Sequence, residues 1–268
     1  MTIKVIKRYD NQVIHIPIRT QMPERIVVKA RHFKRPYTYY FDTAPIINGV
    51  EEIVIKIPDM PEAVVIELYN EKNGNMSFDN SFQIKTIYNY PVKQVLFLEQ
   101  IKDKTVSSFM VFSNEFSEKA GILSAQNSVY KSPDGKFTIH YKDVIRDDDG
   151  KELRTPARIN TNTKIIEIAK KYYISYTVAG RKAINLHEFS HLWRNKNSHS
   201  EIEADKNAIM VYLGFGNPVI EAYNVFLKVF INSPHEGKDT QVNRYNELKN
   251  FINETARRIN VALPQSTN

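Results

Sequence analysis

The first ninety residues of the chain are a series of short segments rich in β-branched and aromatic residues, without the periodicity of a helix. Proline, glycine, asparagine and aspartate, which favour turns, separate these segments. The predicted strands are NQVIHIPI (11–18), ERIVVKA (24–30), EEIVIKI (51–57), AVVIELYN (63–70) and SFQIKTIYNY (81–90). Several short strands at this spacing are typical of a small antiparallel sandwich, so we predict a β-sandwich-like domain over residues 1–91.

After Pro91 the pattern changes, first to strands mixed with helix and then to helices. Residues 135–145 alternate as a strand does, and residues 165–169 form another predicted strand. From Arg181 onward the apolar residues recur with the period of a helix. Further helices are predicted over about residues 200–213, 219–231 and 241–260. The sequence therefore predicts an α+β chain whose second domain, residues 92–268, combines a small mixed sheet with helices.

The absence of cysteine restricts the chemistry that is open to the chain. It excludes a disulfide framework and a cysteine nucleophile, and any metal must be held by His, Asp or Glu. No apolar run approaches the roughly 18 residues of a membrane span, and MTIKVIKRYD at the N-terminus lacks the apolar core of a secretory signal peptide. We therefore expect a cytoplasmic protein that does not insert into a membrane.

The segment LHEFSHLW places His187, Glu188 and His191 in the order H-E-x-x-H within a predicted helix. Residues four apart lie one above the other on a helix, with Cβ atoms about 6 Å apart, so both imidazoles can reach one zinc ion at about 2.0–2.1 Å. Glu188 points about 100° away from the two imidazoles, where a general base can accept a proton from a water at the metal. The alternative is an amphipathic helix whose two histidines are packing residues.

Two histidines leave a tetrahedral zinc site short of one protein ligand if the fourth position is kept for water. The next segment, SHSEIEADKNAIMVYLG, offers candidates. Ser200 is a suitable N-cap for a helix on which Glu201 and Asp205 share one face. One of these carboxylates can bind the metal, and the other can accept the N–H of a liganding imidazole. Glu203 and His199 are alternative third ligands.

This combination resembles the gluzincin type of zinc metallopeptidase, in which H-E-x-x-H on one helix is followed by E-x-x-x-D on the next. The sequence has His187-Glu188-Phe189-Ser190-His191 and then Glu201-Ile202-Glu203-Ala204-Asp205. The resemblance implies a Zn2+ ion bound by His187, His191 and Glu201. Glu188 is then the general base of peptide-bond hydrolysis, and Asp205 supports a ligand. The short connection between the two motifs is similar to that of a minigluzincin, which implies a zincin-like fold for residues 92–268.

Two further segments fit the same resemblance. TPARINTNTKIIEI (155–168) is similar to the edge strand of a zincin sheet, which binds a protein or peptide substrate as an added strand, and we predict that substrate pairs along Ile165–Ala169. SPHEGKDTQVNRYNEL (233–248) is similar to a His-Pro…Arg segment of some gluzincins, with Glu in place of the proline. That similarity implies an oxyanion-stabilising His235 near the zinc, and it also includes Arg244. Alternative residues for stabilising the oxyanion are Tyr172, Tyr173 and Tyr176.

A structural or assembly role is the main alternative to enzymatic activity. The composition, which is rich in Ile, Lys, Asn and Tyr, is similar to that of proteins from bacteriophages of gut Bacteroidetes, in which such domains can be virion or tail components. In this interpretation the zincin-like domain is a scaffold, its zinc is structural or vestigial, and residues 1–91 bind partner proteins.

The basic stretch KARHFKRPY (29–37) is the strongest candidate for a contact with nucleic acid. The net charge of the chain is +7, but the excess is spread thinly along it. Because no nucleic-acid-binding motif accompanies the basic residues, we expect a solvent-exposed strand or loop here and no nucleic-acid partner.

Overall fold

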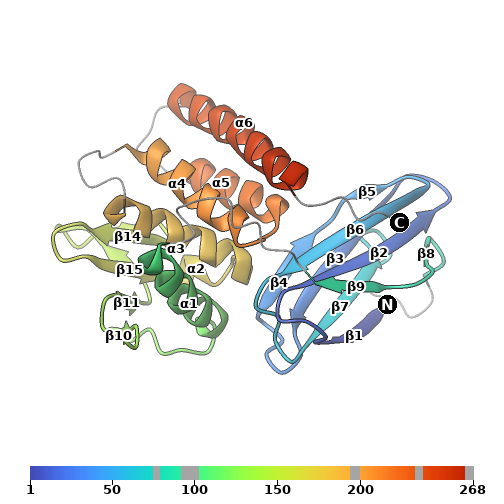
Figure 1. Cartoon of the computed structure of the whole chain (residues 1–268), viewed down its shortest axis with the longest axis horizontal. Helices are drawn as coiled ribbons and strands as arrows, with labels where there is room; N and C mark the ends of the chain where they lie inside the picture. Colours follow the sequence, from blue (N-terminus) through green and yellow to red (C-terminus); the bar gives the residue numbers. More distant parts are fainter. Residues whose placement is uncertain (75–78, 92–102, 194–199, 233–237, 263–268) are drawn as a thin grey trace. The chain divides into compact units, whose positions relative to one another are not determined.

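A computed structural model of the chain describes residues 1–74, 79–91, 103–193, 200–232 and 238–262 (Figure 1). Contacts between Cα atoms divide the chain into two compact units, Met1–Lys93 and Gln94–Asn268. In the described residues the first unit contains strands alone, and the second contains short strands and six helices. The predicted α+β fold class is therefore confirmed. None of the helices in these described ranges is long and apolar enough to cross a membrane.

The first unit consists of two antiparallel sheets. One sheet has the strand order β1 (Thr2–Ile6), β7 (Ala63–Asn70), β3 (Glu24–His32) and β4 (Tyr39–Thr43), with β5 (Ile46–Ile47) also paired to β3. The other has the order β6 (Val50–Ile57), β2 (Gln12–Thr20) and β8 (Phe82–Ile84), with β9 (Tyr88–Pro91) also paired to β2. On β2 the alternate residues Ile14, Ile16 and Ile18 are fully buried, whereas Arg19 is exposed. This alternation gives the sheet one apolar inner face, as a sandwich requires.

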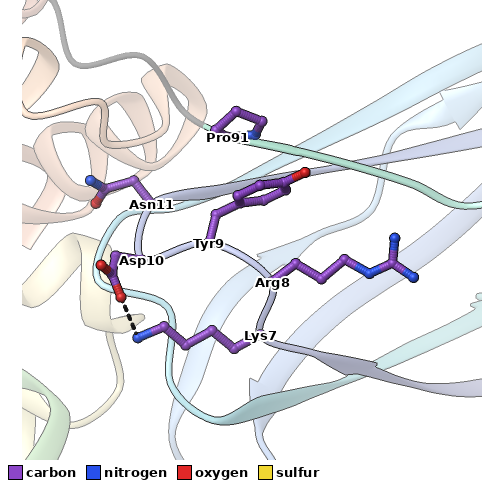
Figure 2. Close-up of a pocket in the computed structure, with 6 residues that line it drawn as sticks. All are labelled: Lys7, Arg8, Tyr9, Asp10, Asn11 and Pro91. Carbon is purple, nitrogen blue, oxygen red and sulfur yellow. Dashed lines mark ion pairs between the residues drawn. The ribbon is translucent and has the colours of Figure 1, made fainter.

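The turn between β1 and β2 forms a surface pocket on the first unit (Figure 2). Within the turn, Lys7 Nζ lies 2.8 Å from Asp10 Oδ1, and both side chains are exposed to solvent. The residues that line the pocket are Lys7, Arg8, Tyr9, Asp10, Asn11 and Pro91. An exposed ion pair of this kind contributes at most about 1 kcal/mol, and the pocket contains no pair of groups suited to catalysis or to metal binding.

The sheet of the second unit has the strand order β10 (Ser128–Lys131), β11 (Thr138–Lys142), β15 (Ile165–Ala169) and β14 (Ala157–Asn160). β11 and β15 run parallel, while β10 and β14 are antiparallel to their neighbours. β15 is therefore an interior strand, and β14 is an edge strand. The prediction that substrate pairs along Ile165–Ala169 is wrong, because that strand already has a partner on each side. A separate hairpin joins β12 (Ile145–Arg146) to β13 (Glu152–Leu153).

Helices make up most of the rest of the second unit. They are α1 (Lys104–Lys119), α2 (Lys170–Tyr173), α3 (Val178–Leu192), α4 (Glu201–Gly214), α5 (Val219–Asn232) and α6 (Lys238–Ala262). The last three lie within three residues of their predicted bounds. α3 begins before Arg181, because the Thr177 hydroxyl accepts the N–H of Gly180 at 3.0 Å and so caps the helix there. Ser200 is the N-cap of α4, as predicted, and its hydroxyl accepts the N–H of Glu203 at 3.4 Å.

α3 is buried on every side along most of its length, and all of its residues from Val178 to Leu186 are buried. Its polar side chains are therefore hydrogen-bonded inside the unit. The Asn185 amide donates to the Ser113 and Ser117 hydroxyls at 3.0 and 3.2 Å, and its carbonyl accepts from the Tyr173 hydroxyl at 2.9 Å. These bonds join α3 to α1 and α2, and they fix the helix that carries the H-E-x-x-H residues.

Gly180 marks the closest approach of α3 to α5. A Cβ atom added at this position lies 2.7 Å from Cγ2 of Val225, which is itself 2% exposed. We expect Gly180→Ala to lower the free energy of unfolding by about 1–2 kcal/mol, because overpacking costs about 1–3 kcal/mol and alanine recovers at most about 1 kcal/mol of helix propensity.

The matched control is Gly121→Ala, since a Cβ at Gly121 meets no atom within 4 Å. Urea unfolding followed by the fluorescence of the single tryptophan, Trp193, measures both variants. Equal stability of the two variants would show that α5 accommodates the added methyl group without strain.

Glu167 lies in the middle of β15 and links three strands of the four-stranded sheet of the second unit. Its carboxylate accepts hydrogen bonds from Lys142 on β11 and from Arg158 on β14. Burial raises the pKa of Glu167, but the hydrogen bonds from Lys142 and Arg158 outweigh burial and hold the pKa below its usual value of 4.5. The ionised form of Glu167 therefore stabilises the pairing of the edge strand β14 with the rest of the sheet.

The lowered pKa of Glu167 predicts a pH dependence of stability. A carboxyl whose pKa is lowered by folding contributes stability above its unfolded pKa, and this contribution is lost as the pH falls through the folded pKa. We expect the difference in unfolding free energy between the wild type and Glu167→Gln to be full at about pH 6–7 and to shrink below about pH 4.5. Urea titrations across this range measure it, and a difference that stays constant down to about pH 3 contradicts the assignment.

Candidate metal centre

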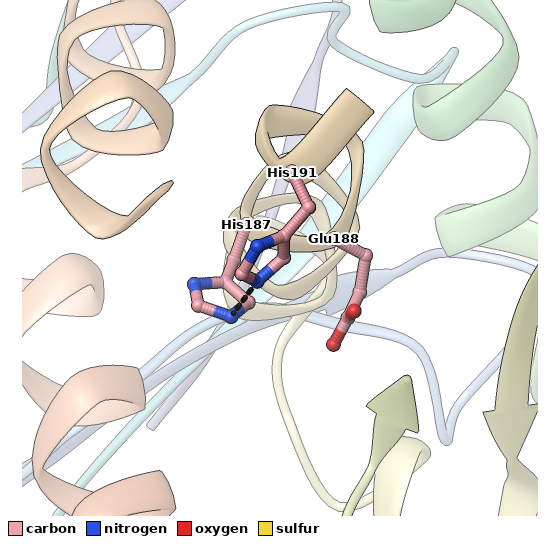
Figure 3. Close-up of side chains that lie close together, drawn as sticks. All are labelled: His187, Glu188 and His191. Atoms are coloured by element: carbon pink, nitrogen blue, oxygen red, sulfur yellow. Dashed lines mark hydrogen bonds between the residues drawn. The ribbon is translucent and has the colours of Figure 1, made fainter. Parts of the chain in front are cut away.

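His187, Glu188 and His191 lie in the last two turns of α3, and their ligand-type atoms are all within 4.8 Å of one another. Figure 3 shows the two imidazoles close together and the Glu188 carboxylate to one side of them. The Nε2 atoms of His187 and His191 are 3.3 Å apart, and their rings are nearly perpendicular at 87°. The i, i+4 spacing thus brings the two nitrogens to one point.

The Glu201 carboxylate completes this arrangement from the first residue of α4. Its Oε2 lies 3.2 Å from His187 Nε2, and its Oε1 lies 3.7 Å from His191 Nε2. A tetrahedral zinc site with ligands at about 2.0–2.1 Å has ligand atoms about 3.3–3.4 Å apart. The two imidazole nitrogens and the Glu201 carboxylate, with a different oxygen nearest each histidine, lie at separations close to this value, and the donor set of two imidazoles and a carboxylate suits zinc.

The structure distinguishes Glu201 from one of its two rivals. Glu203 lies on another face of α4, where its carboxylate is 3.4 Å from Lys206 Nζ. His199 lies outside the described residues. Among the residues that the structure describes, Glu201 is therefore the carboxylate that α4 places beside the Nε2 atoms of both histidines.

Asp205 lies one turn after Glu201 and is 1% exposed. Its Oδ1 is 2.7 Å from His187 Nδ1, so the imidazole donates this N–H to the carboxylate and turns Nε2 toward Glu201 and His191. Burial lowers the pKa of His187, but the Asp205 carboxylate outweighs burial and holds the pKa well above the usual 6.5. Burial and the charge of His187 lower the pKa of His191. His191 is therefore neutral near pH 7 and offers a lone pair.

Glu188 is 7% exposed and faces the edge strand β14, where the N–H of Ile159 donates to its carboxylate. Burial raises the pKa of Glu188 to about 7, although the charge of His187 and this N–H lower it. A carboxyl group with a pKa near neutrality can both accept and release a proton, as a general base and acid must.

The edge strand β14 turns the main-chain groups of its alternate residues away from β15. The carbonyl of Pro156 accepts the N–H of Ala169 at 2.9 Å, so the residues at even positions face β15. Ala157 and Ile159 consequently direct their main-chain groups to the outer edge, on the side of Glu188.

The residues predicted to stabilise an oxyanion have different outcomes. Tyr173 is wrong, because it is fully buried and its hydroxyl is bonded to Asn185. For Tyr172 and Tyr176 the role stays a prediction. The Tyr172 hydroxyl donates to Glu152, and Tyr176 is 8% exposed. His235 lies outside the described residues.

Arg244 on α6, which the sequence included only through the similarity of residues 233–248 and without a stated role, contacts both carboxylates of α4. Its Nε donates to Asp205 Oδ2 at 2.8 Å, and one terminal nitrogen lies 2.6 Å from the same oxygen and 3.4 Å from Glu201 Oε2. Arg244 is four residues before Leu248 and eight before Ile252, both of which are 1% exposed. A charged residue in line with the apolar stripe of a helix is the sequence signal that identifies such a position.

The basic stretch of the first unit is engaged in ion pairs. Lys29 lies 3.3 Å from Asp42, Arg31 lies 2.6 Å from Glu67, and Lys34 lies 2.8 Å from Glu62. Part of its positive charge is therefore neutralised locally. The absence of a nucleic-acid partner stays a prediction.

Comparison of the chain with models of known protein families, with curated proteins and with solved structures found no match. The interpretation of the metal centre accordingly depends on the geometry of its side chains.

Proposed function

We propose that the chain is a zinc-dependent peptide hydrolase of the gluzincin type. The observation that carries this proposal is the meeting of two imidazole nitrogens and the Glu201 carboxylate at separations of 3.2–3.7 Å, beside the buried Glu188. When bound, zinc supplies Lewis acidity that makes a water more acidic and polarises the carbonyl of the scissile bond.

The residues of the chain have separate parts in this reaction. His187, His191 and Glu201 hold the ion, and Asp205 fixes the tautomer of His187. Glu188 accepts a proton from the attacking water while the oxygen of that water bonds to the carbonyl carbon. Glu188 then passes that proton to the amine nitrogen as the C–N bond breaks.

The substrate in this proposal is an extended peptide that adds to β14 as a further strand. In this pairing the outward Ala157 N–H and Ile159 carbonyl bond to the substrate, because the Ile159 N–H is donated to Glu188 on the same side. This position replaces the interior strand Ile165–Ala169 that the sequence had suggested.

Metal content tests the site directly. We expect elemental analysis of the purified wild type to give about one zinc per chain, and His187→Ala to lose it, because two protein ligands hold zinc poorly. His32→Ala is the matched control, since its imidazole accepts the N–H of Lys34 within the first unit. A wild type that contains no zinc after reconstitution would make the two histidines packing residues and would remove the proposal.

Loss of the general base tests the reaction. We expect Glu188→Gln to retain zinc and to hydrolyse an unfolded protein at least about 100-fold more slowly than the wild type, because glutamine cannot accept the proton. Glu203→Gln on the neighbouring helix is the control and should cleave as the wild type does. Zinc bound at full occupancy in a wild type that cleaves no unfolded protein favours the scaffold role instead.

A further inference from the structure

The Arg244 guanidinium touches both carboxylates that α4 contributes to the metal centre. It lies 2.6–2.8 Å from Asp205 Oδ2 and 3.4 Å from Glu201 Oε2. The Arg244 side chain is only 12% exposed, and that of Asp205 is 1% exposed, so their charges meet with little screening by water. One cation from α6 thus contacts the candidate zinc ligand and the residue that orients a second ligand.

The two oxygens of the Asp205 carboxylate have different partners, and this explains how the contact with Arg244 affects the site. Oδ1 accepts the His187 N–H, and Oδ2 accepts a hydrogen bond from Arg244. Because each oxygen has its own partner, the two hydrogen bonds fix the orientation of the carboxylate. Charge-assisted hydrogen bonds of this kind are shorter and stronger than neutral ones. The orientation of His187 Nε2 toward the metal position therefore depends on Arg244 through Asp205.

Docking of α6 does not require this arginine. Leu248 and Ile252 are 1% exposed, and Thr255 is 8% exposed, which places one stripe of α6 in the core of the second unit. A second ion pair, between Lys206 Nζ and Glu247 Oε1 at 2.8 Å, joins α6 to α4 away from the histidines. In the described part of the chain, Arg244 and Glu247 of α6 form ion pairs with α4, and of these two residues Arg244 is the one that reaches the candidate metal centre.

We propose that Arg244 is a positioning residue of the metal centre, which holds Asp205 and Glu201 in the geometry that binds zinc and so makes zinc affinity dependent on α6. This inference rests on the proposed zinc site. Outer partners of metal ligands typically change metal affinity by about 10- to 100-fold when they are removed.

The test measures the zinc dissociation constant of the full chain by competition with a chelator, for the wild type, Arg244→Gln, Arg244→Lys and Glu247→Gln. We expect Arg244→Gln to bind zinc about 10- to 100-fold more weakly. Arg244→Lys should lie between Arg244→Gln and the wild type, because lysine restores the charge but not the fork of donors. Glu247→Gln, which removes the other α4–α6 ion pair, should stay within about 2-fold of the wild type, because an exposed pair contributes little.

A spectroscopic measurement separates positioning from loss of folding. The visible absorption of bound Co2+ reports the geometry of its ligands, and we expect it to change in Arg244→Gln and to be unchanged in Glu247→Gln. In an Asp205→Asn background, Arg244→Gln should have a smaller effect on zinc affinity, because the arginine acts through that carboxylate. If Arg244→Gln unfolds, Arg244→Lys and the Co2+ spectrum still decide the question.

The outcomes distinguish this inference from the proposed function. If Arg244→Gln binds zinc as tightly as the wild type and its Co2+ spectrum is unchanged, the positioning role is overturned and the hydrolase proposal stays intact. An equal loss of affinity in Glu247→Gln also overturns it, because the effect then belongs to helix docking in general. Zinc binding that depends on Arg244 in a protein without hydrolytic activity supports the inference and removes the hydrolase. A wild type that binds no zinc overturns both.

Discussion

The buried carboxylate of Asp205 makes the contacts on which the geometry of the candidate metal centre depends. It is 1% exposed, and it joins α3 through His187 and α6 through Arg244 while belonging to α4. A buried charge without partners costs several kcal/mol, so His187 and Arg244 each stabilise the fold by satisfying this carboxylate. The contact with His187 also orients its Nε2 toward His191 and Glu201. Packing of the helices and orientation of the ligands are therefore one physical constraint.

α3 provides the rigid support that this constraint needs. The helix is enclosed along most of its length, and Asn185 is hydrogen-bonded to three side chains of α1 and α2. Phe189 lies between the two histidines in sequence. Its ring stacks on that of Phe109 of α1, with the ring centroids 4.1 Å apart. A metal site needs ligands held within about 0.5 Å, which regular elements locked by packing provide better than loops do. The two histidines and Glu188 lie on such an element.

The sequence predicted the parts of the site whose geometry is local. The spacing of His187 and His191 and that of Glu201 and Asp205 depend only on the helix repeat, and the structure brings all four together. The order of the strands depends on pairing between distant segments, so the interior position of Ile165–Ala169 could not be derived from its own residues. The buried position of Tyr173 likewise comes from packing with distant segments, and its hydroxyl bonds to Asn185, which pattern reasoning did not mark as its partner.

Charge balance explains why this group of residues suits a divalent cation. Glu201 has a pKa of about 2, because His187, His191 and Arg244 stabilise its ionised form more than burial opposes it. The cationic groups beside it are Arg244 and His187, and the pKa of His187 is held well above the usual 6.5. A proton on His187 Nε2 and a metal ion would require the same position, so they would compete. Exchange of that proton for a divalent cation would add one positive charge, which ionisation of Glu188 would offset. In the proposed hydrolase, a bound cation would therefore favour the ionised Glu188 that a general base requires.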